Sequence, residues 1–380
     1  MSYKNENMKM IELHENGLDI QFRIRENGVV ELADFSSQEV KKAVMEPKDD
    51  ICYPAVEIHR SGTGSLNMHA YKNNINQSSV DFVYENHELK AQAGGKELEI
   101  VMISPEKLKA VYHMRLFDGV PAVQTWTEII NEGSEDQGLT YVSSFMYQGI
   151  SRGGEKPYYK KTDIYVPFNS WCCEAQWQKY DAETLNLNGM VVDGFNHQGY
   201  GLNRYCYSGK GTWSTCEYLP MGIAEDRETG ETYIFQIESS GQWLAEYGSA
   251  QGGNLYLALS GATEQEHGWY KNLKPGESFT TVPAGAAVVK GGLNPAAAAL
   301  TRYRRKVRRP NTDDEKLNVV FNDYMNCLWA LPTREKLVPL IHAAAQVGCE
   351  YFAIDAGWFF ADDNWGPYIG DWRPEDGGAR

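Results

Sequence analysis

The sequence lacks most of the features that mark membrane, secreted and metal-binding proteins. It has no run of 18 consecutive apolar residues, and no apolar signal-peptide core follows its polar first residues. Its seven cysteines are odd in number and form no C-x-x-C pair, and its eight histidines form no H-E-x-x-H. We therefore predict a cytoplasmic protein with reduced thiols, and no metal site, cofactor or membrane partner is indicated.

Positive charge is also scarce. The chain has 36 Lys and Arg residues against 51 Asp and Glu residues, which gives a net charge of −15. Such a chain repels phosphate backbones, so we predict no nucleic-acid partner. The one basic run, at 302–309, is interpreted as a solvated helix face or as a source of ion pairs within the molecule. A neutral substrate such as an oligosaccharide fits this charge balance.

Most of the chain shows the pattern of antiparallel β-structure. Residues 18–25 alternate apolar and polar side chains, Asn27 and Gly28 follow as a hairpin turn, and the alternation resumes at 29–32. Similar short runs recur as far as residue 259, separated by turn residues. The fold class predicted is mainly β: a large antiparallel β-sandwich (supersandwich) over 1–293, followed by a helical linker over 294–316.

A G-x-S-x-G pattern at 149–153 matches the letters of a hydrolase nucleophile elbow. That motif requires a helix directly after the serine. Gly154 and Pro157 disfavour a helix there, so we interpret the pattern as a chance match.

Residues 318–372 have a different organisation. Two short apolar runs, at 318–321 and 348–354, fit buried strands, and a helical pattern lies between them with Thr333 as a plausible N-cap. Strand, helix and strand in about 35 residues indicate a βαβ unit with parallel strands. Asn322 and Asp323 then follow the first strand and Asp355 follows the second, at the sheet edge that carries the chemistry in α/β folds.

The loop after the second predicted strand is rich in aromatic and acidic side chains. Flat apolar rings suit the faces of a sugar, and carboxylates suit its hydroxyls. The alternative is that the rings pack the loop against the sheet and the carboxylates are solvated. The aromatic members are Trp358, Phe359, Phe360, Trp365, Tyr368 and Trp372, and the acidic members are Asp355, Asp362, Asp363 and Asp371.

Three sequence blocks in this region resemble a known family. They read F-N-D-Y-M-N, G-C-E-Y-F-A-I-D-A-G-W and G-D-W, and they are similar to the opening of the catalytic barrel in glycoside hydrolase family 36, the bacterial and fungal α-galactosidases. The resemblance implies an N-terminal β-sandwich, a (β/α)8 barrel that begins within 317–380 and stays incomplete there, and a C-terminal β domain. It also implies hydrolysis with retention of anomeric configuration.

The resemblance also assigns expected roles. Asp355 would grip galactose hydroxyls deep in the pocket, and Trp358 would be the aromatic residue of the family's D-D-G-W block. Two positions depart from the commoner pattern, because Ala356 replaces its second carboxylate and Tyr324 stands where the family has a tryptophan. The exact sugar and linkage therefore stay open. The predicted substrate-binding residues are Asp355, Trp358, Tyr324, Asp323, Asp371 and Trp372.

No catalytic residue is expected in this chain. The family's nucleophile lies in a K-x-D block after the fourth barrel strand, and its acid/base follows the sixth, so both are expected beyond residue 380. Two K-x-D matches, at 48–50 and 179–181, lie far upstream of the barrel and are interpreted as chance.

The region 171–207 leaves two interpretations open. It is rich in Trp, Tyr, Asn and Gly with weak periodicity, so it is either a long loop over one end of the sandwich or strands that the pattern does not delimit. Family members place N-terminal loops and subunit contacts near the site. Trp171, Trp177 and Trp213 fit either such a subsite or interface, or the core of the sandwich.

The function predicted is that of an α-galactosidase-type retaining hydrolase acting on α-galactosyl oligosaccharides of the melibiose and raffinose class. We expect the full-length protein to be a homo-oligomer and the 380-residue chain alone to be inactive. The alternatives are a non-catalytic carbohydrate-binding or oligomerisation module, and a truncated gene product.

Overall fold

The hairpin predicted near the start of the chain is present in the computed structural model. Strand β2 (Leu18–Ile24) pairs antiparallel with β3 (Val30–Ser37), and β1 (Lys9–Glu15) adds to β2, which gives a three-stranded sheet. The structure describes residues 9–40, 42, 44–45, 52–64, 72–187, 203–250, 254–359 and 366–373. The K-x-D match at 48–50 and the loop residues Phe360, Asp362, Asp363 and Trp365 lie outside this part.

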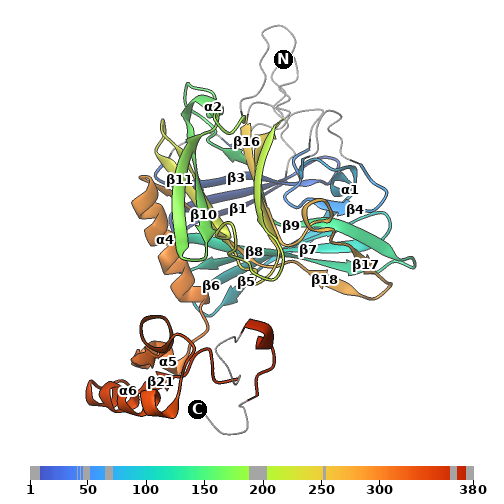
Figure 1. Ribbon diagram of the computed structural model, residues 1–380. Coiled ribbons are helices and arrows are strands. Elements are labelled where there is room, and N and C mark those ends of the chain that lie inside the picture. The colour runs from blue at the N-terminus through green and yellow to red at the C-terminus, as the bar shows by residue number, and fades with distance from the viewer. Residues whose placement is uncertain are drawn as a thin grey trace. The chain divides into compact units, whose positions relative to one another are not determined.

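The chain divides into two compact units, Met1–Val307 and Arg308–Arg380. The first unit is built on a ten-stranded antiparallel sheet with the order β11-β10-β13-β14-β19-β8-β7-β6-β5, to which β18 adds at β8 (Figure 1). Its strands are β5 (Val83–Gln92), β6 (Gly95–Ile103), β7 (Leu108–Phe117), β8 (Val120–Asn131), β10 (Thr162–Ser170), β11 (Cys173–Asp181), β13 (Met221–Asp226), β14 (Glu231–Ile237), β18 (Ser278–Thr280) and β19 (Ala284–Lys290).

A second large sheet has six antiparallel strands with the order β12-β15-β16-β9-β17, and β4 also pairs with β9. The strands are β4 (Ile58–Arg60), β9 (Gln137–Ile150), β12 (Arg204–Gly209), β15 (Trp243–Ala250), β16 (Asn254–Ser260) and β17 (Lys271–Leu273). Short helices interrupt the strands: α1 (Gln77–Val80), α2 (Tyr158–Lys161) and α3 (Glu264–His267).

One hydrophobic core joins the three sheets. Phe22 of β2 contacts Tyr112 of β7 with ring centroids 5.9 Å apart, and Phe35 of β3 contacts Phe145 of β9 at 5.5 Å. Alternate residues of each strand point into this core, because successive side chains of a strand face opposite sides. The predicted mainly β fold with large antiparallel sheets is therefore confirmed.

Helix α4 (Leu293–Val307) covers the outer face of the ten-stranded sheet, as Figure 1 shows in orange. Its apolar stripe, which includes Leu300 and Tyr303, packs on Ile234 of β14, whereas the neighbouring Tyr233 and Phe235 face the inner core. A Cβ at Gly285 would lie 2.4 Å from the Tyr303 ring, so this glycine allows the helix to approach the sheet. The basic run is exposed along the opposite face of the helix and just after its end, where Arg304 also donates a hydrogen bond to Gln236 and Arg308 lies 3.7 Å from Asp314.

The region 171–207 contains strands rather than one long loop, although 188–202 lies outside the described residues. Strand β11 lies in this region and forms a hairpin with the preceding β10, and β12 begins at Arg204. The core interpretation is wrong for Trp171 and Trp213, which are 75% and 56% exposed, whereas Trp177 packs partly buried against the cluster beneath α4. After Ser151 no helix begins until Tyr158, so no nucleophile elbow forms.

The second unit contains the predicted βαβ arrangement. Strand β20 (Val320–Asn322) pairs parallel with β21 (Tyr351–Ala353), and α6 (Arg334–Gln346) connects them with Thr333 as its N-cap. The strands are shorter than the runs 318–321 and 348–354 that predicted them. The remaining elements are α5 (Thr312–Lys316), the π-helix η1 (Tyr324–Leu328) and the 3₁₀-helix η2 (Gly366–Tyr368).

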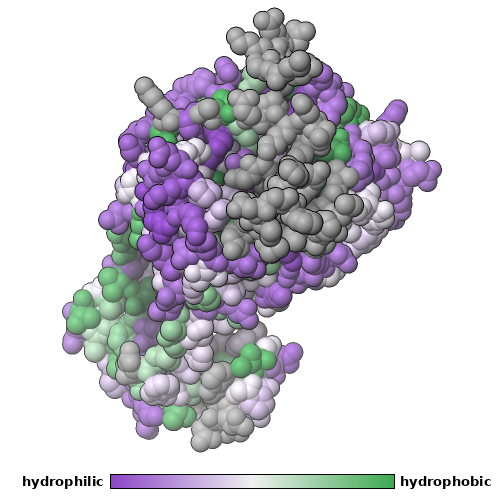
Figure 2. All heavy atoms as spheres, turned by 90° about the horizontal axis from the view of Figure 1, so that it is seen from above, coloured by the Kyte–Doolittle hydropathy of each residue, from purple (hydrophilic) through white to green (hydrophobic). Residues whose placement is uncertain are grey.

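Exposed apolar side chains concentrate in this second unit. The face shown in Figure 2 is mainly hydrophilic with separate hydrophobic patches. Among the described residues, most of the large exposed hydrophobic side chains belong to residues after 307, including Val320 and Tyr351 on the two paired strands. A two-stranded parallel sheet cannot cover both of its faces, because parallel strands are normally buried on both sides. The others are Leu317, Val319, Met325, Trp329, Val338, Ile341, Val347, Ile354, Tyr368, Ile369 and Trp372.

Candidate functional site

The parallel pairing brings the predicted polar residues to one edge of the strand pair. Asn322 is the last residue of β20, and its register partner in β21 is Ala353, two residues before Asp355. The Asn322 side-chain amide donates a hydrogen bond of 2.7 Å to Asp355 Oδ2, and the Asp355 backbone N–H donates one of 2.9 Å to Asp323 Oδ1. The adjacent residues Asn322 and Asp323 thus form one hydrogen-bonded group with Asp355, which lies more than 30 positions later in the sequence.

Asp355 presents an exposed carboxylate whose orientation is restrained at both oxygens. Its Oδ1 accepts a hydrogen bond of 2.7 Å from the Ala356 backbone N–H, while Oδ2 accepts the bond from Asn322. A carboxylate held in this way keeps lone pairs free for further donors, since each oxygen can accept about two hydrogen bonds. The arrangement suits recognition of hydroxyl groups.

Asp323 differs from Asp355, because it is 1% exposed. One oxygen supports the Asp355 backbone, but Oδ2 has no hydrogen-bond partner among the described residues. A buried carboxylate oxygen without a partner is energetically costly, so this atom is a position where a further donor is required. Asp323 therefore positions Asp355 in this structure.

Tyr324 is held next to this group by the same asparagine. Its backbone N–H donates 2.8 Å to Asn322 Oδ1, and its ring lies 5.9 Å from that of Trp329. Trp329 and Ala330 both have positive φ, at 50° and 66°, and they form a tight turn after η1. This turn contacts the D-A-G-W segment, since a Cβ at Gly357 would lie 2.3 Å from the Ala330 carbonyl oxygen.

The aromatic residues form a second group. The Trp372 ring lies 4.9 Å from Phe359 and 6.4 Å from Trp358, and the rings of Trp358 and Phe359 are 5.4 Å apart. Phe359 is buried, so it fits the packing interpretation of this loop, whereas Trp372 is 58% exposed and Trp358 is half-buried. The exposed rings provide flat surfaces that a sugar ring can cover.

Asp371 is the predicted site residue that joins neither group. It is exposed, its backbone N–H bonds to the Tyr368 carbonyl, and its carboxylate lies 3.6 Å from Arg373 Nε. The predicted set also omitted two residues that matter for the geometry, Asn322 and Gly357. Asn322 was signalled by its place at the strand end, and Gly357 by its place within the D-A-G-W block.

Within the residues that the structure describes, one group of metal-ligand type side chains occurs, and it lies in the sandwich. Glu97, Glu99 and His113 come together there. His113 Nδ1 is 3.0 Å from Glu97 Oε1, while Gln92 and Lys90 bind the other carboxylate oxygens of the pair. These carboxylates already have hydrogen-bond partners within the protein. None of the described helices is long and apolar enough to cross a membrane.

Comparison with known proteins supports the resemblance to α-galactosidases. No protein-family profile matches the chain. It is 29% identical over 148 residues to α-galactosidase AgaA of Geobacillus stearothermophilus, which is 39% of this chain and 20% of that protein. It is 26% identical over 202 residues to α-galactosidase Mel36A of Lactobacillus acidophilus, which is 51% of this chain and 27% of that protein.

Solved structures agree over nearly the whole chain. The family 36 α-galactosidase AgaB of Geobacillus stearothermophilus matches with a TM-score of 0.73 and 16% identity, over 98% of this chain and 52% of that one. The chain resembles the family 36 α-galactosidases. AgaA of the same organism, solved in complex with raffinose, matches with a TM-score of 0.70 and 16% identity, over 94% and 51%. At this identity the family 36 structures show a shared fold.

The chain spans about half the length of the family 36 structures that it matches. The segments aligned with the curated α-galactosidases take up between 19% and 27% of those proteins.

Proposed function

We propose that this chain forms the N-terminal part of a retaining glycoside hydrolase that acts on α-galactosyl oligosaccharides. The observation that carries the proposal is the hydrogen-bonded group of Asn322, Asp323 and Asp355 at the carboxyl edge of two parallel strands, beside the exposed rings of Trp358 and Trp372. Family 36 α-galactosidases have the same fold, and AgaA has been solved with raffinose and with stachyose.

In this proposal the six predicted residues bind substrate. Asp355 accepts hydrogen bonds from two sugar hydroxyls, Trp358 and Trp372 cover an apolar ring face, and Asp323 holds the Asp355 backbone. Tyr324 and Asp371 extend the pocket on either side. Neutral hydroxyls suit the site because its described side chains include carboxylates and aromatic rings.

The same geometry argues against catalysis by these carboxylates. Retaining hydrolysis uses two carboxyl groups about 5–5.5 Å apart on opposite sides of the scissile bond. Asp323 is buried behind Asp355 rather than facing it, because its Oδ1 accepts from the Asp355 backbone. We therefore propose that the 380-residue chain alone does not hydrolyse α-galactosides, since a (β/α)8 barrel takes roughly 250 residues and the second unit has one βαβ.

The domain limits 1–293, 294–316 and 317–380 remain part of the proposal, together with homo-oligomeric assembly of the full-length protein and a cytoplasmic location. A second candidate is a non-catalytic carbohydrate-binding or oligomerisation module. The exposed apolar strands of the second unit favour it, because they require a covering partner.

The test compares the chain alone with a chimera that joins it to the remaining half of AgaA. Nitrophenol release from a nitrophenyl α-galactoside should stay at the uncatalysed rate for the chain and become enzymatic in the chimera. In the chimera, Asp355→Asn should lower kcat/KM by a factor that corresponds to a loss of about 2–4 kcal/mol of transition-state binding. The exposed Asp313→Asn should leave kcat/KM unchanged. Turnover by the chain alone, or a folded chimera indifferent to Asp355→Asn, would refute the assignment.

A further inference from the structure

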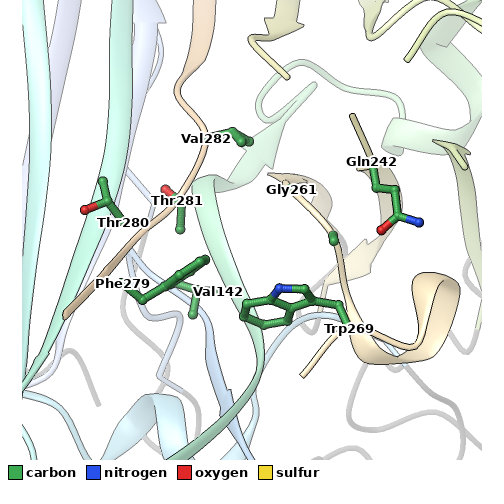
Figure 3. Close-up of a pocket in the computed structure, with 9 residues that line it drawn as sticks. Val142, Gln242, Gly261, Trp269, Phe279, Thr280, Thr281 and Val282 are labelled. Carbon is green, nitrogen blue, oxygen red and sulfur yellow. The ribbon is translucent and has the colours of Figure 1, made fainter. Parts of the chain in front are cut away.

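A pocket of about 220 Å³ lies in the first unit, where the two large sheets meet (Figure 3). Val142 of β9 and Phe279 of β18 provide one wall, so each sheet contributes a strand. Gln242 precedes β15, and Trp269 lies between α3 and β17. The side chains thus come from segments far apart in sequence.

The apolar part of the pocket is held in place by local structure. Thr263 caps α3 with its side chain and Gly268 ends that helix in the left-handed region, and the Trp269 backbone N–H then donates 3.1 Å to the Thr263 carbonyl. This cap directs the indole toward Phe279, with ring centroids 5.1 Å apart and planes tilted by 44°. Both rings are half-buried, so each keeps a surface that a ligand can cover.

Polar groups complement these rings. The Gln242 side-chain amide and the Trp269 indole N–H have no hydrogen-bond partner among the described residues. Thr281 is buried, and its hydroxyl oxygen accepts a bond of 3.0 Å from the Thr127 backbone, so its side chain is fixed in the pocket wall. In Figure 3 the indole nitrogen lies on the ring edge nearest Gly261. The pocket thus combines two aromatic surfaces with donors and an acceptor.

The lining excludes two classes of ligand. Its described residues carry no charge, so a charged ligand would lose its hydration without a counter-charge. A purely apolar ligand would cover the Gln242 amide and the indole N–H without a partner, which costs free energy. A pocket for a drug-sized ligand measures about 300–1,000 Å³, so this smaller one suits a single ring.

We propose that this pocket is a carbohydrate-binding site for one neutral pyranose ring, with an apolar sugar face on Trp269 and Phe279 and hydroxyls on the Gln242 amide and the indole N–H. The inference rests on the proposed function only for the choice of a galactoside as probe. A sugar site in the sandwich would hold an oligosaccharide chain independently of the residues at the ends of β20 and β21.

The test uses the full chain labelled with ¹⁵N at its tryptophan indoles. The Trp269 resonance is assigned by its loss in Trp269→Phe, and methyl α-galactoside is the first probe, with methyl α-glucoside as the second. We expect a saturable shift of the Trp269 resonance with a pyranoside and none with the same concentration of cyclohexanol, which lacks the hydroxyl pattern.

Variants separate the pocket from the proposed hydrolase site. Gln242→Ala should weaken the affinity measured from the Trp269 shift about tenfold, as expected for the loss of one or two hydrogen bonds. Tyr270→Ala, at an exposed neighbour outside the pocket, should leave this affinity unchanged. The Trp269 response should persist in Asp355→Ala, so failure of the hydrolase proposal would leave it intact. No saturable shift with either pyranoside, or an equal shift with cyclohexanol, would overturn the inference.

Discussion

At Gly357 the backbone leaves no room for a side chain. Its φ is +108°, and a Cβ would lie 2.3 Å from the Ala330 carbonyl oxygen. Gly357→Ala should therefore displace the turn at Ala330 or the D-A-G-W segment and move Asp355 and Trp358. We expect a loss of about 1–3 kcal/mol in stability of the second unit, measured by hydrogen exchange of its amides.

Gly366→Ala is the matched control for this glycine, because a Cβ there would meet nothing within 4 Å. If the amides of the second unit are equally protected from hydrogen exchange in both variants, the close contact at Gly357 does not affect the stability of this unit.

The burial of Lys72 lowers the stability of the first unit by an amount that depends on pH. It is 2% exposed, its Nζ donates 2.7 Å to the Ser249 carbonyl, and burial lowers its pKa to about 8 although Glu246 opposes the shift. In the unfolded chain a lysine titrates near 10.4, so between about pH 8 and 10 the unfolded state binds more protons. The free energy of unfolding therefore rises with pH over this range, and the destabilisation caused by burying the charged Lys72 is fully present below pH 8.

Lys72→Met removes this titration. The free energy of unfolding of the variant relative to that of the original chain should fall by about 1–3 kcal/mol from pH 7.5 to 10, as measured by urea denaturation at each pH. Lys290→Met, at an exposed position of β19, serves as the control. A difference that does not change with pH would mean that Lys72 titrates as an ordinary surface lysine.

Among the elements, α4 is the clearest case of an amphipathic helix added to a sheet. Leu300 is 3% exposed against the ten-stranded sheet, while Arg305 lies on the solvated face. Leu300→Ala should lower the unfolding free energy of the first unit by about 2–5 kcal/mol, as for a large-to-small change in a core. Arg305→Ala should stay within about 0.5 kcal/mol.

Urea denaturation monitored by circular dichroism distinguishes these two variants. Similar midpoints for both would show that α4 is not docked on the sheet.

At the level of the whole molecule, limited proteolysis tests where the first domain ends, at the proposed limit of residue 293 or at Val307, where the first compact unit ends. Because α4 packs on the sheet, trypsin should spare Arg302, Arg304 and Arg305 within it and cut first at Arg308 or Lys316. The product expected by mass spectrometry is a protected fragment that ends near residue 308. First cuts near residue 293 would place α4 with the linker, and early cuts in 80–180 would contradict a stable sandwich.

Local patterns in the sequence determined several features of this protein. The alternation at 18–25 with Asn27 and Gly28 specified a hairpin, because side-chain period and turn chemistry are local properties. The apolar runs around Thr333 likewise specified parallel strands joined by a helix, and hence the common edge that holds Asn322 and Asp355. The three sequence blocks that resemble family 36 lie within the same region, 318–372, and they predicted the likeness to that family.

Tertiary structure alone decided what these residues contact. Strand order in the ten-stranded sheet depends on packing between distant segments, so no local pattern predicted that β8 pairs with β19. The same applies to the burial of Asp323 and the exposure of Trp171 and Trp213, since composition states only how often a residue type is buried. The Trp269 pocket arises where two sheets and a helix cap meet, and such a site exists only once residues more than 100 positions apart pack together.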